Sequence, residues 1–171
     1  MALVPSSAME ENFRIAEVNG MDQSALIDAF RTCVAVERWA RELADGRPFA
    51  NLAGLLARAD ELSASLTDAE LRHSLDDHPR IGARTAQGSM SAAEQSGVDS
   101  VTLADRLLAA NRAYEERFGH IYLVAAAGRD GEELLADCAA RMANDPVTEL
   151  GVVRRELGLI ARLRLERMIG A

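Results

Sequence analysis

Signals that start α-helices recur along this 171-residue chain, and they constrain its fold more than any other feature. In a capping box, a hydroxyl or carboxylate before the helix and a carboxylate three residues later satisfy backbone N–H groups that the first turn leaves unpaired. The pattern occurs at 67–70 (TDAE), 91–94 (SAAE) and 130–133 (DGEE), and Asp145-Pro146 is another start. Apolar residues follow these starts at the spacing of a helical face. The sequence therefore predicts an all-α fold.

The caps and the apolar spacing also predict where the helices lie. We expect them over residues 22–31, 32–44, 48–63, 67–76, 91–97, 100–117, 130–143 and 145–169. The run IYLVAAA at 121–127 is too short for periodicity to classify, and we expect a buried, partly extended segment there. The length suits one domain. We predict a flexible tail at 1–12 and a single-domain bundle of about seven to nine helices over 13–171, without a substantial sheet.

The charged residues exclude several classes of function. All 19 basic residues are arginine, and the chain contains no lysine. Schiff-base chemistry, a pyridoxal-phosphate lysine and a phosphate-loop lysine are therefore excluded. The formal net charge of -8 is scattered along the sequence, which argues against a nucleic-acid partner, because phosphates require a basic face.

The cysteines and histidines show no metal-binding pattern. Cys33 and Cys138 fall inside helical patterns without a C-x-x-C spacing, and we interpret both as reduced core thiols of a cytoplasmic protein. His73, His78 and His120 do not have the spacing of metal ligands, so we expect no metal. No segment reaches the roughly 18 apolar residues of a membrane span, so no membrane association is expected.

One arginine of the last helix departs from plain packing. Arg164 lies inside the apolar stripe of that helix, roughly 20° from the direction of Leu157. A guanidinium directed at a core must be matched by a carboxylate, by carbonyl oxygens or by an anionic ligand. A structural ion pair is the simplest of these explanations, and a ligand site is the alternative.

Two further stretches carry groups that could transfer protons. In DDHPRIG, Pro79 disfavours helical geometry at His78, although the helix dipole alone favours a histidine at such an end. Ser91 and Glu94 are explained by capping, whereas Gln95 adds an amide that suits urea-like or amide-like groups. Together with the buried arginine, these residues indicate proton-transfer chemistry on a small polar molecule without identifying that molecule.

Four stretches, in their order and spacing, resemble one known family. They are HPRIG at 78–82, SAAEQ at 91–95, FGH at 118–120 continuing into IYLVAAAGR, and LIARLRLERMI at 159–169. In these stretches the sequence is similar to the 2-oxo-4-hydroxy-4-carboxy-5-ureidoimidazoline (OHCU) decarboxylases, which take the last step of urate oxidation to (S)-allantoin. The resemblance covers nearly everything after about residue 13.

The resemblance implies an all-α fold, no cofactor, a small-molecule ureidoimidazoline substrate and a homodimer. His78 matches the catalytic histidine of the family, and we expect Glu94 to orient it or share its proton. The positions that the resemblance assigns to substrate binding are Pro79, Ser91, Gln95, Tyr122, Leu123, Val124, Ala125, Ala126 and Arg164. The sequence departs from the family at His120, where many members have an aromatic residue, and at 80–82, where RIG replaces Asp-Leu-Ala.

Two other functions stay open on the sequence alone. The chain could be a non-catalytic helical binding partner of purine-degradation enzymes. It could also be a cofactor-free lyase or hydrolase that acts on another ureido acid, since His78, Glu94 and Arg164 would suit such a substrate as well.

Overall fold

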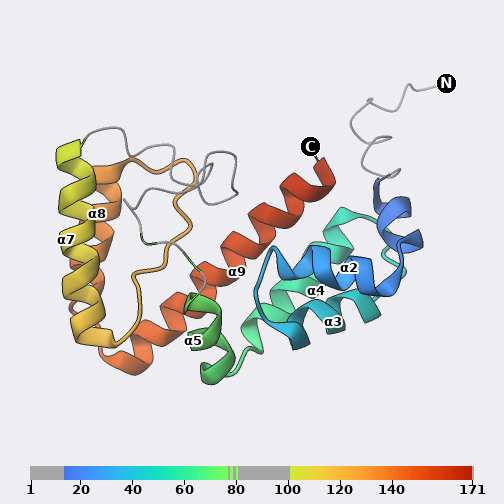
Figure 1. The fold of residues 1–171 in the computed structure, drawn as a ribbon, viewed down its shortest axis with the longest axis horizontal. Coiled ribbons are helices and arrows are strands. Elements are labelled where there is room, and N and C mark those ends of the chain that lie inside the picture. The colour runs from blue at the N-terminus through green and yellow to red at the C-terminus, as the bar shows by residue number, and fades with distance from the viewer. Residues whose placement is uncertain (1–13, 77, 79, 81–100, 171) are drawn as a thin grey trace. The chain divides into compact units, whose positions relative to one another are not determined.

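The computed structural model describes residues 14–76, 78, 80 and 101–170. All the regular structure in these residues is helical, which confirms the predicted all-α class. Residues 14–20 form a first helical stretch. The helices that follow (Figure 1) are α2 (Gln23–Arg31), α3 (Glu37–Asp45), α4 (Leu52–Ala64), α5 (Asp68–Asp76), α7 (Val101–Phe118), α8 (Gly131–Arg141) and α9 (Pro146–Gly170). The tail predicted at 1–12 and the short helix predicted at 91–97 lie outside the described residues.

Two of the predicted helix starts are wrong. Helix α3 begins at Glu37 rather than at 32, because α2 closes at Thr32 and Val36 is extended, with φ −125° and ψ 113°. β-branched residues in this stretch favour that geometry. Helix α4 begins at Leu52 rather than at 48, because the Asn51 side chain accepts the Gly54 N–H at 2.9 Å and caps the helix.

The chain divides into two compact units, Met1–Thr67 with Gly158–Ala171, and Asp68–Leu157. The single domain expected over 13–171 therefore stays a prediction. In the first unit, α2, α3 and α4 bury an apolar core around Trp39, whose ring meets Phe30 edge-on at 6.5 Å. The indole Nε1 of Trp39 donates to the Ser63 hydroxyl at 3.0 Å. A buried indole N–H requires such a partner.

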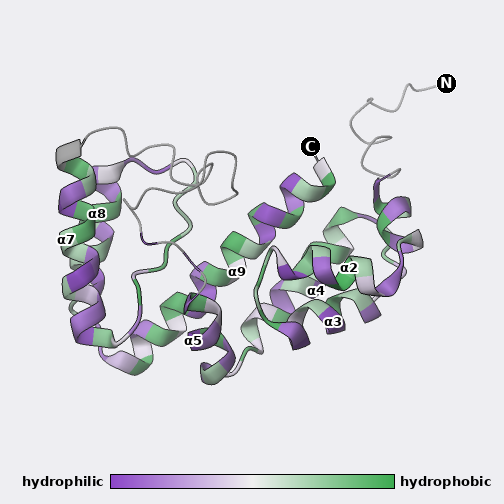
Figure 2. Cartoon of the chain, viewed as in Figure 1, coloured by the Kyte–Doolittle hydropathy of each residue, from purple (hydrophilic) through white to green (hydrophobic). Residues whose placement is uncertain are grey.

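The second unit builds its core between α7, α8 and the segment that connects them. Along α7, hydrophobic and hydrophilic residues alternate within each turn, as expected of a helix with one buried face (Figure 2). Its core consists of Leu107, Tyr114, Phe118, Tyr122, Val124, Ala126, Leu134 and Cys138. Residues 121–126 are neither helix nor strand and are largely buried, so the predicted burial is confirmed for these residues, whereas Ala127 is exposed in a turn.

The predicted state of the thiols is also confirmed, since Cys33 and Cys138 are both buried and neither forms a disulfide. Among the described residues, no helix has the length and apolar character that crossing a membrane requires.

Candidate active site

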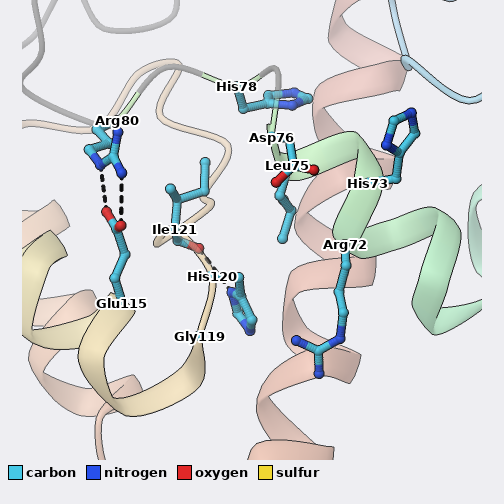
Figure 3. Close-up of a pocket in the computed structure, with 10 residues that line it drawn as sticks. All are labelled: Arg72, His73, Leu75, Asp76, His78, Arg80, Glu115, Gly119, His120 and Ile121. Carbon is cyan, nitrogen blue, oxygen red and sulfur yellow. Dashed lines mark hydrogen bonds and ion pairs between the residues drawn. The ribbon is translucent and has the colours of Figure 1, made fainter.

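The second unit contains a pocket of about 570 Å³, a size within the usual range of small-molecule sites. It is lined by the end of α5, the residues just after it, the last turns of α7 and the start of the α7–α8 connection (Figure 3). The lining residues are Arg72, His73, Leu75, Asp76, His78, Arg80, Glu115, Gly119, His120 and Ile121. All three histidines of the chain line this pocket. Its mostly ionisable lining favours a polar ligand.

His78 lies just beyond the C-terminal end of α5. Its backbone N–H donates to the Leu75 carbonyl at 3.1 Å, which extends the last turn of the helix. Its ring Nδ1 lies 2.7 Å from the Ser74 carbonyl oxygen. Because a carbonyl oxygen only accepts, Nδ1 carries the proton of this hydrogen bond. In the neutral ring Nε2 is then the basic nitrogen.

Arg80 and Glu115 form a two-pronged ion pair at the edge of the pocket (Figure 3). The guanidinium donates through Nε and Nη2 to the two carboxylate oxygens at 2.6 and 2.8 Å. The pair joins the segment after α5 to α7. Hydrogen bonding from Arg80 lowers the pKa of the Glu115 carboxyl below its ordinary value. Glu115 is therefore a charged anchor for Arg80 rather than a proton donor.

His120 keeps an aromatic ring at the position where the sequence departs from the family. The ring is half-buried, with its centroid 5.6 Å from that of Tyr114 and 6.1 Å from that of Phe118. Its Nδ1 lies 3.1 Å from the Ile121 carbonyl oxygen, so this nitrogen also carries its proton. Burial lowers the pKa of His120 below its ordinary value. The residue combines aromatic packing with an uncharged polar ring on the pocket wall.

Arg164 belongs to the first unit and is buried, with 6% of its surface exposed. The prediction from periodicity that it faces a core is therefore confirmed. Its Nη1 donates to the Cys33 carbonyl oxygen at 3.1 Å, so a backbone carbonyl is one of its partners. This contact is the carbonyl alternative that the sequence left open.

The structure brings only some of the predicted site residues together. His78 lines the pocket, whereas Pro79, Ser91, Glu94 and Gln95 lie outside the described residues. Of the connecting segment, Ile121 lines the pocket and the next five residues do not. The side chain of Tyr122 points into the core, where its hydroxyl donates to Asp137. Within the described part of the chain, no three His, Cys, Asp or Glu side chains gather where a metal ion could be held.

The sequence model of one family, OHCU decarboxylase, matches residues 19–166 of the chain. The chain belongs to the OHCU decarboxylase family. The 2-oxo-4-hydroxy-4-carboxy-5-ureidoimidazoline decarboxylase of Amia calva is 30% identical over 164 residues, covering 90% of this chain and 93% of that protein. The enzyme of the same name from Mus musculus is 30% identical over 175 residues, covering 92% and 93%.

A solved structure has a similar fold. It is described as the crystal structure of OHCU decarboxylase in the presence of (S)-allantoin, with a TM-score of 0.74 and 21% sequence identity. The match covers 84% of this chain and 99% of that one. At this identity the likeness supports the fold, while the family assignment depends on the sequence matches.

In this member of the OHCU decarboxylase family, the sequence reasoning missed a buried ion pair in the second unit. Arg141 and Glu149 are 6% and 0% exposed, and the guanidinium donates through Nε and Nη2 to Oε1 of Glu149 at 2.8 and 2.6 Å. A signal was available, because Glu149 precedes Ile160 by three helical turns and so points in the same direction on α9. Glu149 lies roughly 80° from the direction of Leu157, at the edge of the apolar stripe, so the periodicity marks it much less clearly than Arg164.

Proposed function

We propose that this chain catalyses the decarboxylation of OHCU to (S)-allantoin, the last step of urate oxidation, without a cofactor. The observation that carries the proposal is the placement of His78. Its Nδ1 proton is committed to the Ser74 carbonyl, and it lines a polar pocket in a chain whose family is established over 19–166. A histidine held in this way can exchange a proton through Nε2 near neutral pH.

The chemistry of the substrate explains why such groups suffice. When the C–CO₂ bond breaks, its electron pair flows into the conjugated C=N of the ring. The ring nitrogen that received the pair takes one proton, the neighbouring ring carbon takes a second, and the hydroxyl loses its proton to become a carbonyl, so that one proton is taken up for each CO₂ released. The protein must therefore orient the carboxylate out of the ring plane, stabilise the developing charge and deliver the proton to one face.

In this proposal His78 is the general acid and base, and Glu94 orients it or shares its proton. Pro79, Ser91, Gln95, Tyr122 to Ala126 and Arg164 are proposed to bind the substrate, by their match to the motifs of the family. We also propose that the protein is a cytoplasmic homodimer. The buried thiols of Cys33 and Cys138, which form no disulfide, suit a reducing compartment.

The test supplies freshly generated OHCU and follows the optical activity of the allantoin that forms. Spontaneous decay gives a racemic product, so the wild-type protein is expected to accelerate the reaction and to give an excess of the S enantiomer. If the protein neither accelerates the reaction nor gives an enantiomeric excess, the proposed activity is refuted.

A matched pair of variants tests the role of His78. His78→Asn removes the basic nitrogen, and kcat/KM is expected to fall by at least about 100-fold. His73→Asn is the control, because His73 is exposed and lines the same pocket. Near-normal turnover by a folded His78→Asn protein would exclude the acid–base role.

The two alternative functions give different results in the same assays. A non-catalytic binding partner would bind OHCU or allantoin without accelerating the loss of CO₂. A lyase or hydrolase for another ureido acid would leave OHCU to its spontaneous decay and convert a chemically stable ureido acid instead.

A further inference from the structure

The non-helical segment 121–126 is held by side chains of three different helices. The Tyr122 N–H donates to Oδ1 of Asn111 on α7 at 3.0 Å, and the Ala125 N–H donates to Oε2 of Glu156 on α9 at 2.9 Å. Between them, the Leu123 carbonyl accepts from Nη1 of Arg141 on α8 at 2.8 Å. A buried segment without a strand partner needs such bonds, because its backbone groups have no ladder to satisfy them.

Arg141 is itself fixed by Glu149, whose carboxylate accepts hydrogen bonds from three side chains. Besides Arg141, the Tyr114 hydroxyl donates to Oε1, and Nδ2 of Asn144 donates to Oε2 at 2.7 Å. The guanidinium also lies 4.8 Å from the centroid of the Tyr122 ring. Nε, Nη1 and Nη2 of Arg141 are each hydrogen-bonded, and its guanidinium lies over the Tyr122 ring. Arg141 therefore has little freedom to move relative to the Leu123 carbonyl.

The ion pair of Arg141 and Glu149 is connected to the pocket wall in two ways. Leu123 is two residues from Ile121, which lines the pocket. The Tyr114 ring, whose hydroxyl is bound to Glu149, meets the ring of the pocket residue His120 edge-on. The ion pair thus supports both neighbouring pocket residues without contacting the pocket itself.

Fold stability alone does not account for a buried ion pair at this place. Removing two charges from water is costly, and apolar side chains of similar volume are often as stabilising or more so. An apolar pair could not, however, donate to the Leu123 carbonyl. What the ion pair adds over apolar packing is a defined position for the backbone of this segment.

We infer that Arg141 and Glu149 are positioning residues for the reaction, which hold the Gly119–Ile121 wall of the pocket in its active geometry through the Leu123 carbonyl and the Tyr114 ring. This inference rests on the proposed function, because it assigns the pocket to that reaction. A displacement of about 1 Å in a site can cost about 100-fold in rate, so support of this kind affects turnover directly.

The experiment uses the double variant Arg141→Met/Glu149→Leu, which removes both charges together and leaves neither one buried alone. Ser63→Ala is the control, because it breaks the buried hydrogen bond of Trp39 in the first unit and leaves segment 121–126 intact. For each protein, kcat and KM, the enantiomeric excess corrected for spontaneous decay, and amide exchange of Tyr122 and Ala125 are measured.

We expect the double variant to fold, to lose at least about 10-fold in kcat and to give a lower enantiomeric excess. Its amides at Tyr122 and Ala125 should exchange at least about 10-fold faster, while the control keeps wild-type values per folded molecule. A double variant with wild-type kcat and enantiomeric excess would overturn the inference even if exchange increased.

Two further outcomes are decisive. If the double variant does not fold, Glu149→Gln takes its place, since it keeps the shape and an acceptor oxygen but removes the charge. Unchanged exchange and unchanged kcat in that variant would overturn the inference. If the wild-type protein lacks activity, the proposed function fails, and amide exchange alone decides whether the ion pair holds the segment.

Discussion

The two tyrosines of this protein are both buried against carboxylates, and we predict that neither ionises while the fold is intact. Tyr114 and Tyr122 are 0% and 2% exposed, and their hydroxyls donate to Glu149 and Asp137. Burial is the main cause that raises the pKa of both phenols, the carboxylates raise each pKa further, and the charge of Arg141 opposes them. Each phenol is therefore a permanent neutral donor in the native protein.

The size of the effect follows from the difference between folded and unfolded states. In the unfolded chain a tyrosine ionises near pH 10, so above that pH the unfolded state binds fewer protons and the free energy of unfolding falls as pH rises. The loss is about 1.4 kcal/mol per pH unit for each tyrosine, or about 4 kcal/mol for both at about pH 11.5. Burial also raises the pKa of the Cys138 thiol to about 11, so ionisation of this thiol in the unfolded chain begins to lower the free energy of unfolding at a lower pH than the tyrosines do. Since domains are stable by about 5–15 kcal/mol, unfolding is expected between about pH 11 and 12.5.

The assay follows tyrosinate absorbance and far-ultraviolet circular dichroism in one alkaline titration. The chain contains no lysine, so few other side chains titrate in this range. Both tyrosines should ionise together, in the same transition in which the helices unfold, and Tyr122→Phe should reduce the pH dependence of stability by about half. Ionisation near pH 10 with unchanged helicity would refute the buried, carboxylate-bound arrangement.

Three other perturbations test separate parts of the structure. Burial lowers the pKa of His120, so its contribution to the free energy of unfolding is complete above about pH 6.5 and is lost as pH falls below that value. His120→Phe should weaken this pH dependence in urea unfolding, and an equal pH dependence in both proteins would contradict the prediction. Arg80→Ala should cost less than about 1 kcal/mol because the pair with Glu115 is partly exposed, yet lower kcat several-fold; stability lost with kcat unchanged would exclude a role in supporting the pocket. Arg164→Met should cost about 1–3 kcal/mol by leaving the Cys33 carbonyl without this donor, and should weaken (S)-allantoin binding in calorimetry; unchanged binding would remove Arg164 from the proposed substrate site.

The helices could be predicted because their signals are local. In the capping box at Asp130 and Glu133, each side chain accepts the backbone N–H of the other residue, at 2.8 and 2.9 Å, as the sequence pattern requires. The wrong start of α4 occurred where two local signals compete. Pro48 is a good first helical residue, but Asn51 is a stronger cap, and the sequence alone does not rank them.

The candidate site was predictable to a smaller extent, for the same reason. The burial of Arg164 follows from the period of one helix, and the bond from His78 to Ser74 spans only four residues. The contact between Arg141 and the Leu123 carbonyl spans 18 residues. It depends on which backbone groups an irregular segment leaves unpaired, and no periodicity reports that.

Three of the buried polar side chains satisfy backbone groups outside the helices. Among the described residues, Asn111, Arg141 and Arg164 are buried, and each bonds a backbone group of a non-helical segment, at Tyr122, Leu123 and Cys33. Inside a helix the backbone satisfies itself, so buried polar side chains are needed where the chain leaves helical geometry. An arginine suits this position because its planar fork can donate to a carboxylate and a carbonyl at once while it stays charged. In a chain without lysine, arginine thus combines two tasks: it carries the buried positive charge, and it holds the irregular backbone next to which a pocket can form.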